Sequence, residues 1–486
     1  MLQFDSSTFR FGPQRSILGA QTIRYEQSRA LEDYSTYTVV IGVGHLTFNV
    51  LQSLLEQSIA GIIVTVPSTN NIGSSSTLTI ASLSRLTINV PIYFVEDEDI
   101  KEDLVGGDLR LVTSDKTPSP TPITQWNVIN FSGRLVGQVE RGDSIVPPTV
   151  VVVAHYDTFS RLAPAFVSTT INRREQSTSG VVALLELSRI FSKLYSSADN
   201  QPAYNIIFLL TSGSATNYQG AEQWLSQQSP VVSESIDLVV CIDSLISGRS
   251  NDEPLYLHVS RPPKDNTTRQ LYSDFTTSAS DFGLEMNLVQ KKINISSPVI
   301  YWEHEVFSRK RIPAVTVSQR KQPFDQSTEP LLLVDQPINT RSLATNIQII
   351  AKAIINHIYA NEKISKDILV AEDSVLSVNE AFIDSWSNAL SRVTRSLPFV
   401  DVGQIQPAIE KLLNTYLLDV VVDSSKSGTS SGLVCYQPIQ TILSFSNVKS
   451  FTFDILVFVG CIVYLIALYF GLCGKDRAFN EIKSFF

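Results

Sequence analysis

Side chains able to bind a metal or to move a proton stand at the ends of two apolar runs. The run Thr149–Ala154 is followed by His155 and Asp157. The run Leu238–Ile242 is followed by Asp243. If both runs are buried parallel strands, their carboxyl ends meet at the sheet edge where open α/β sheets bind ligands. Imidazole and carboxylate groups at that edge are candidate zinc ligands.

Two further residues complete the candidate set. Glu175 precedes an amphipathic helical pattern, where it could bridge two metals or pair with Arg173 or Arg174. His304 lies in the segment Tyr301-Trp-Glu-His-Glu-Val-Phe307. Taken singly, each candidate is explained as well by a structural role. Their order along the chain and their placement at strand ends are together harder to explain by structural roles alone.

Other chemistries are not indicated. The sequence has no Gly-x-Ser-x-Gly elbow for a serine nucleophile, and Cys241 lies inside an apolar strand, where a thiol is inert. The pair Gly42-x-Gly44 lacks the third glycine of a dinucleotide fingerprint and is interpreted as a turn. The four cysteines have neither metal-binding spacing nor the density of a disulfide framework. A net charge of −9 argues against nucleic acid as a direct partner.

Positioning these residues requires a sheet buried on both faces. Near-continuous apolar runs predict its strands at Trp126–Phe131, Thr149–Ala154, Tyr204–Leu210, Leu238–Ile242, Leu255–Val259 and Ala314–Val317. Helical periodicity follows Gly180 and recurs over Leu343–Ile358. The fold class is therefore α/β: a peptidase-like, mostly parallel sheet flanked by helices, with a small N-terminal α/β unit and a C-terminal transmembrane helix.

The chain divides by composition into five parts. We expect an N-terminal α/β unit over 1–124, an α/β domain over 125–362, a helical segment and linker over 363–450, a span over 455–473 and a tail over 474–486. In the third part, 375–397 and 405–420 have amphipathic helix patterns, and 423–432 has a linker composition.

The segment Ile455–Cys473 predicts a membrane span, because its 19 residues carry no charge. A buried core helix is the alternative, but such helices usually keep a polar face. Lys475 and Arg477 follow the span, so the positive-inside rule predicts a cytosolic tail and a lumenal body.

A lumenal body requires an N-terminal export signal, and residues 1–10 do not resemble one. We expect that a signal peptide is missing from this sequence; the alternative is a tail-anchored protein with a cytosolic body. Sequons at Asn130, Asn266 and Asn294 are compatible with a lumenal body.

The motifs together resemble the zinc aminopeptidase family that includes glutamate carboxypeptidase. Within it the chain is most similar to the nicalins, which are related to nicastrin. The matching stretches include Val-Val-Ala-His-Tyr-Asp157, Asn217-Tyr-Gln-Gly220, Leu257-His-Val-Ser-Arg-Pro-Pro263 and Trp302-Glu-His-Glu-Val-Phe307. The resemblance covers nearly the whole chain, including the C-terminal apolar run.

The resemblance implies a role for each candidate. His155, a bridging carboxylate and Asp243 would hold the first zinc, with Asp157 orienting His155. The bridging position holds Glu175, and His304 would bind the second zinc. Two departures disable this pattern: Ser214 stands at the general-base position and Ala215 at the second-zinc glutamate position.

We therefore expect no catalytic residue and no cofactor, although a single weakly bound zinc stays open. The resemblance implies a non-catalytic scaffold in the endoplasmic reticulum membrane, in complex with the nodal modulator protein and a small multi-pass protein. Such a complex assists multi-pass membrane protein biogenesis at the ribosome-associated translocon, and receptor assembly or signalling. The alternatives are an active membrane-bound zinc aminopeptidase and a peptide-binding receptor that uses the old cleft.

Overall fold

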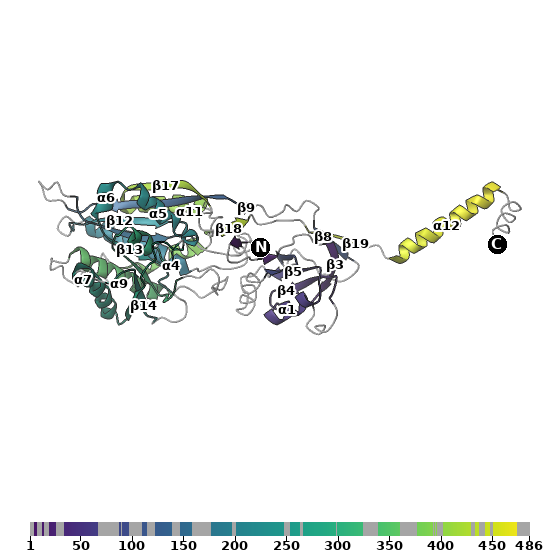
Figure 1. Ribbon diagram of the computed structural model, residues 1–486, viewed down its shortest axis with the longest axis horizontal. Coiled ribbons are helices and arrows are strands. Elements are labelled where there is room, and N and C mark those ends of the chain that lie inside the picture. The colour runs from purple at the N-terminus through teal and green to yellow at the C-terminus, as the bar shows by residue number, and fades with distance from the viewer. Residues whose placement is uncertain are drawn as a thin grey trace. The chain divides into compact units, whose positions relative to one another are not determined.

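The computed structural model describes residues 4–6, 12–13, 19–25, 34–66, 87–88, 90–96, 109–113, 122–138, 146–157, 176–196, 201–246, 253–262, 266–297, 299–323, 339–359, 377–391, 393, 395, 402–428, 433–436, 443–447 and 451–473. Its contacts divide the chain into two units (Figure 1). The first unit comprises residues 1–12, 67–87 and 120–439, and the second comprises 13–66, 88–119 and 440–486. Each unit therefore combines segments from both ends of the chain.

An eight-stranded mixed sheet forms the centre of the first unit. Its order is β15-β14-β16-β13-β11-β12-β10-β17. The strands are β10 (Gln125–Leu135), β11 (Thr149–His155), β12 (Asn205–Thr211), β13 (Ile236–Ile242), β14 (Leu255–Val259), β15 (Met286–Gln290), β16 (Ala314–Ser318) and β17 (Leu418–Gly428). The four central strands β16, β13, β11 and β12 run parallel, and antiparallel pairs join them to β14 and β10.

Alternating side chains of the central strands face two helical layers. Val150 and Val152 of β11 pack in one core with α4 and α9, while Val151 and Val153 pack in the other with α5 and α8. The helices are α4 (Gln176–Tyr195), α5 (Gln219–Gln227), α6 (Pro230–Ser235), α7 (Asn266–Asp281), α8 (His304–Arg309), α9 (Thr340–Ile358), α10 (Glu380–Ser391) and α11 (Val402–Tyr416). The turn η4 spans Ser214–Thr216. Burial on both faces explains why these strands are continuous apolar runs.

Short strands complete the first unit. β1 (Phe4–Ser6), β18 (Leu433–Tyr436) and β9 (Pro122–Ile123) form a three-stranded antiparallel sheet in the order β1-β18-β9. Outside this unit's own strands, β2 (Gly12–Pro13) and β6 (Thr87–Ile88) form a two-stranded sheet whose residues are divided between the two units.

The second unit contains a six-stranded sheet in the order β19-β8-β3-β4-β5-β7. Its elements are β3 (Gly19–Arg24), β4 (Thr38–Gly42), α1 (Phe48–Glu56), β5 (Gly61–Val66), β7 (Ile92–Glu96), β8 (Leu109–Thr113) and β19 (Leu443–Asn447). The parallel core β3-β4-β5-β7 agrees with the small N-terminal α/β unit that the sequence predicts. Thr47 caps α1 by accepting a hydrogen bond from the Val50 amide.

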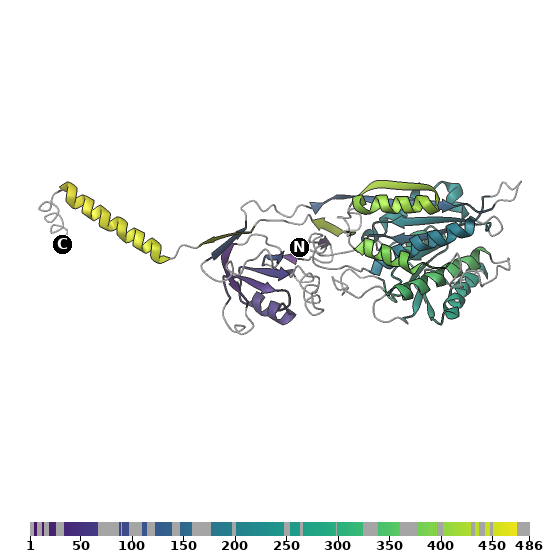
Figure 2. The ribbon, with the colours of Figure 1, turned by 180° about the vertical axis from the view of Figure 1, so that it is seen from behind.

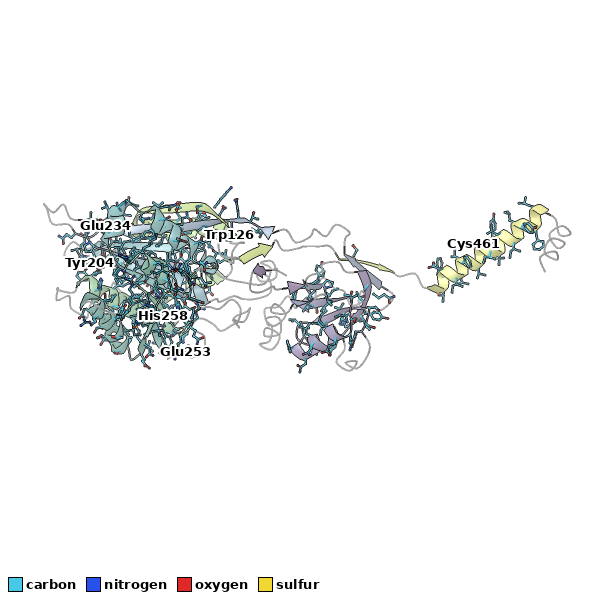
Figure 3. All side chains as sticks on the ribbon, in the orientation of Figure 1. Trp126, Tyr204, Glu234, Glu253, His258 and Cys461 are labelled. Carbon is cyan, nitrogen blue, oxygen red and sulfur yellow. The ribbon has the colours of Figure 1, made fainter. Side chains whose placement is uncertain are left out.

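The last element is the helix α12 (Phe451–Cys473), which is long and apolar enough to cross a membrane (Figure 2). Its side chains are exposed, and Cys461 projects from its middle (Figure 3). An exposed apolar helix of this length needs a lipid environment, since no protein core covers it. Within the part of the chain that the structure describes, it is the one such helix, which supports a single-pass membrane protein.

Two expectations about the C-terminal part are wrong. The linker predicted at 423–432 is a strand as far as Gly428, because β17 pairs with β10 from Gln125↔Gly428 to Arg134↔Leu418. The helix predicted over 405–420 ends at Tyr416, since β17 begins two residues later.

The sequon at Asn130 does not mark a surface position. Asn130 is buried in β10, where its side-chain amide donates to the Gly220 carbonyl and its side-chain oxygen accepts from the Ser212 amide. A glycan could not be attached to Asn130 in this fold. Asn294, by contrast, is exposed.

Candidate functional site

His155 is the last residue of β11 and points into a group of charged side chains. β11 lies between β12 and β13 in parallel register, so Thr211, the last residue of β12, pairs with His155. Val153 pairs with Cys241, which brings Asp243 beside His155. The strand-end argument from the sequence is therefore correct for this pair.

A close approach of α4 to the strand ends requires glycine. A Cβ atom on Gly180 would lie 2.7 Å from the carbonyl oxygens of both Ile242 and Asp243. Gly180 thus lets the first turn of α4 pack directly against the backbone that carries Asp243.

The imidazole of His155 lies between two carboxylates. Nε2 is 3.7 Å from Oδ1 of Asp243, and Nδ1 is 3.5 Å from Oε2 of Glu303. Burial lowers the pKa of His155, but the contact with Glu303 and the charges of Asp243 and Asp157 outweigh burial and raise it. The site therefore favours the charged imidazolium, whereas a metal-binding histidine must be neutral.

Asp243 is occupied by donors of the protein itself. Its Oδ2 accepts from the Ser318 hydroxyl at 2.9 Å, from Nη2 of Arg320 at 3.1 Å and from Nε of Arg320 at 3.3 Å. Burial raises the pKa of Asp243, but the Arg320 guanidinium, with His155 and the hydrogen bonds, outweighs it and lowers the pKa. Asp243 is thus an ion-paired carboxylate.

Asp157 is held by the turn that follows β12. Its Oδ2 accepts from the Ser214 amide at 3.0 Å and from the Ser214 hydroxyl at 2.8 Å. Burial raises the pKa of Asp157, and His155 and Ser214 oppose that shift without overcoming it. Gly213 supplies the left-handed backbone, at φ +85°, that starts the turn η4. Ser214, the residue at the predicted general-base position, is engaged with Asp157.

Tyr218 packs its ring edge-on against His155, with ring centroids 5.8 Å apart. Both Asn217 and Tyr218 have left-handed backbone, at φ 61° and 54°. Two consecutive non-glycine residues in this conformation cost free energy, which the packing of α5 and η4 must offset. This backbone conformation places the edge-on contact of the Tyr218 ring with the imidazole of His155.

His304 is buried at the start of α8 and serves a different contact. Its Nδ1 is 2.8 Å from the Thr316 hydroxyl in β16. Burial and the charge of His258 lower the pKa of His304 to about 3, so His304 is neutral. Among the described residues, no contact joins His304 to His155, Asp157 or Asp243. Glu175 lies outside the described residues.

Two charged residues of the cluster around His155, Asp157 and Asp243 were not predicted from the sequence. Glu303 is buried beside His155, and its Oε1 accepts from the Thr211 hydroxyl at 2.5 Å. Arg320 follows the end of β16, the strand next to β13. The same strand-end argument, applied to Ala314–Ser318, would have identified Arg320.

The described residues do not fit a zinc pair. No three of their His, Cys, Asp or Glu side chains are arranged to hold a metal ion. Asp157 and Asp243 already accept hydrogen bonds, and the raised pKa of His155 disfavours the neutral imidazole that a metal needs. A metal-binding role for Glu175 and the other candidates stays a prediction.

Comparison with known proteins identifies the fold and its relatives. The pattern of Peptidase family M28 matches residues 134–330. The human protein "BOS complex subunit NCLN" is 27% identical over 503 aligned positions, covering 96% of this chain and 86% of the human one. Nicalin of Caenorhabditis elegans is 26% identical over 77% of this chain and 67% of its own. The crystal structure of the γ-secretase component nicastrin matches with a TM-score of 0.56 at 10% identity, covering 92% of this chain and 98% of that one, and it shows the fold alone.

Proposed function

We propose, on the premise that the chain is a peptidase-like relative of nicalin, that it is a non-catalytic, membrane-anchored subunit of a protein complex. The observation that carries the proposal is the contact of Ser214 with Asp157. Hydrolysis by a zinc peptidase needs a carboxylate that takes a proton from the attacking water. The residue at that position is a serine whose amide and hydroxyl both donate to Asp157.

The charge cluster supports the same conclusion. Asp243 and Asp157 are engaged by Arg320 and Ser214, and the ring of Tyr218 lies against His155. Among the described candidates, Asp157 and Asp243 are thus committed to neighbours in the protein. The peptidase fold then acts as a rigid body that α12 holds at a membrane.

The complex we propose is one of the endoplasmic reticulum membrane. The human relative is named as a BOS complex subunit. By that likeness, the partners are the nodal modulator protein and a small multi-pass membrane protein. The assembly acts at the ribosome-associated translocon in multi-pass membrane protein biogenesis, and in receptor assembly or signalling. In this arrangement the body is lumenal and the tail is cytosolic.

Exchange of the span tests the proposal. Epitope-tagged full-length chain is purified from membranes solubilised in mild detergent, and co-purifying membrane proteins are identified by mass spectrometry. Replacing 451–473 with an unrelated apolar helix of equal length should weaken their recovery. Helix packing in lipid depends on small residues such as Gly460 and Gly471, beside which no other side chain lies in the structure.

The matched control changes the cluster and keeps the span. His155→Ala with His304→Ala should leave partner recovery unchanged, provided that thermal unfolding shows a folded body. If the span exchange has no effect while the folded double variant loses its partners, the old cleft is the interaction site. A peptide-binding receptor would then replace the scaffold proposal.

A further inference from the structure

We infer that the guanidinium of Arg320 takes the place of a metal ion at Asp243, as a cation built into the chain. Arg320 donates several hydrogen bonds to the Asp243 carboxylate, neighbouring elements fix its position, and buried carboxylates surround it. This inference concerns the internal chemistry of the first unit and does not depend on the complex proposed above.

The contact between Arg320, whose side chain is 17% exposed, and the buried Asp243 involves more than one bond. Nη2 and Nε of Arg320 lie 3.1 Å and 3.3 Å from the same oxygen, Oδ2, and Nη2 lies 3.5 Å from Oδ1. Ser318 adds a hydroxyl donor to Oδ2 at 2.9 Å. The planar guanidinium, with its fixed fork of donors, suits a carboxylate in this way.

Neighbouring elements fix the position of Arg320. Its amide donates to the Ser318 hydroxyl at 3.0 Å, and its carbonyl accepts from Nε2 of His258 at 2.7 Å. His258 of β14 stacks on Trp302 with centroids 4.0 Å apart, and the Arg320 guanidinium lies 5.9 Å from the same Trp302 ring. His258 (labelled in Figure 3) thus connects β14 to Arg320. Arg320 is therefore fixed both by its backbone hydrogen bonds and by the contacts of its guanidinium with the Trp302 ring and the Asp243 carboxylate.

The surrounding charge requires a cation at this point. Asp157, Asp243 and Glu303 are buried around His155, and Arg320 forms an ion pair with Asp243. Buried carboxylates without a counter-charge are strongly destabilising. In a metallopeptidase the metal supplies that counter-charge. In this chain the guanidinium supplies it.

The experiment is a double-mutant cycle on the full chain in detergent, read by thermal unfolding. Arg320→Met should lower Tm by about 5–10 °C, because it leaves Asp243 charged, buried and without its main counter-ion. In the background of Asp243→Asn, the same Arg320→Met change should cost less than half as much, since no carboxylate is left to neutralise. If Arg320→Met alone does not fold, the double variant should still fold.

The control is an ion pair of the same chemistry at the surface. Arg134 pairs with Asp419, and their side chains are 56% and 62% exposed. Arg134→Met should change Tm by about 2 °C or less. Zinc is then titrated into the unchanged chain, where we expect no rise in Tm and no bound zinc after gel filtration.

Three results would overturn the inference. One is an equal cost of Arg320→Met with and without Asp243→Asn. Another is failure of the double variant to fold while Asp243→Asn alone folds. The third is zinc bound by the unchanged chain and lost in Asp243→Asn, because Asp243 would then serve a metal with Arg320 in place.

Discussion

Residues from four strands, a turn and the start of a helix meet around His155. Each charged group in the cluster has a partner of opposite charge or a hydrogen-bond donor: Ser214 for Asp157, Arg320 for Asp243, and His155 with Thr211 for Glu303. At the scale of single residues, the cluster therefore has the character of a structural core.

The absence of hydrolysis is testable on purified protein. The full chain in detergent, given aminoacyl and peptide substrates with added zinc, should show no more turnover than His155→Ala. Loss of a general base alone costs about 10²–10⁴-fold in rate. Turnover that depends on zinc and disappears in His155→Ala would refute the non-catalytic proposal and favour an active aminopeptidase.

The sequence predicts part of this cluster, for a geometric reason. His155 and Asp243 end neighbouring parallel strands, and the contact between them follows from strand register. Glu303 reaches His155 from the segment before α8, and no periodicity separates it from Glu305 two residues later. Loop paths of this kind depend on tertiary contacts, so a single sequence does not specify them.

At the scale of elements, continuous apolar strands were predictable and edge strands were not. β11 and β13 are buried on both faces and consist mainly of Val, Ile and Leu. β17 lies at the sheet edge, half-exposed, and its second half reads Asp-Ser-Ser-Lys-Ser-Gly. Its partner β10 lies far away in the sequence, so composition alone suggests a linker.

Hydrogen exchange distinguishes a strand from a linker. We expect the amides of 418–428 that face β10 to be protected in the full chain, since β17 pairs with β10 from Leu418 to Gly428 with one irregularity between Ser132 and Arg134. Gly133→Val should speed exchange there, because a Cβ at Gly133 already lies 2.8 Å from Cδ1 of Leu417. Exchange in β14, six strands away in the sheet order, serves as the control. Fast exchange of 418–428 in the unchanged chain would contradict the pairing.

At the scale of the whole molecule, the side of the membrane on which the body lies follows from charge around α12. Lys475 and Arg477 after the helix predict a cytosolic tail. A lumenal body would meet the glycosylation machinery, and the structure separates its sequons. Asn294 is exposed, with its side-chain oxygen accepting from the Ser296 amide in a turn, whereas Asn130 is buried.

Glycan mapping therefore reports topology. When the chain is expressed in animal cells from its natural transcript, Asn294→Gln should increase its gel mobility by one glycan, an effect that glycosidase treatment of the unchanged chain reproduces. Ser132→Ala destroys the Asn130 sequon without touching the buried amide, and it should change nothing. A chain that carries no glycan and whose body is digested by protease in intact microsomes would instead be a cytosolic tail-anchored protein.

Strands that are far apart in the sequence pair with each other, and this affects the order in which the protein folds during translation. β1, at residues 4–6, pairs with β18 at 433–436, and β8 pairs with β19, which ends at Asn447. β1 must wait for β18, and β19 is translated only four residues before α12 begins. Both units thus gain their final strands when the apolar helix is about to leave the ribosome. Completion of the body and insertion of the anchor then fall within one interval of translation. Earlier stalling would leave β1 and β9 without their shared partner β18, and β8 without β19.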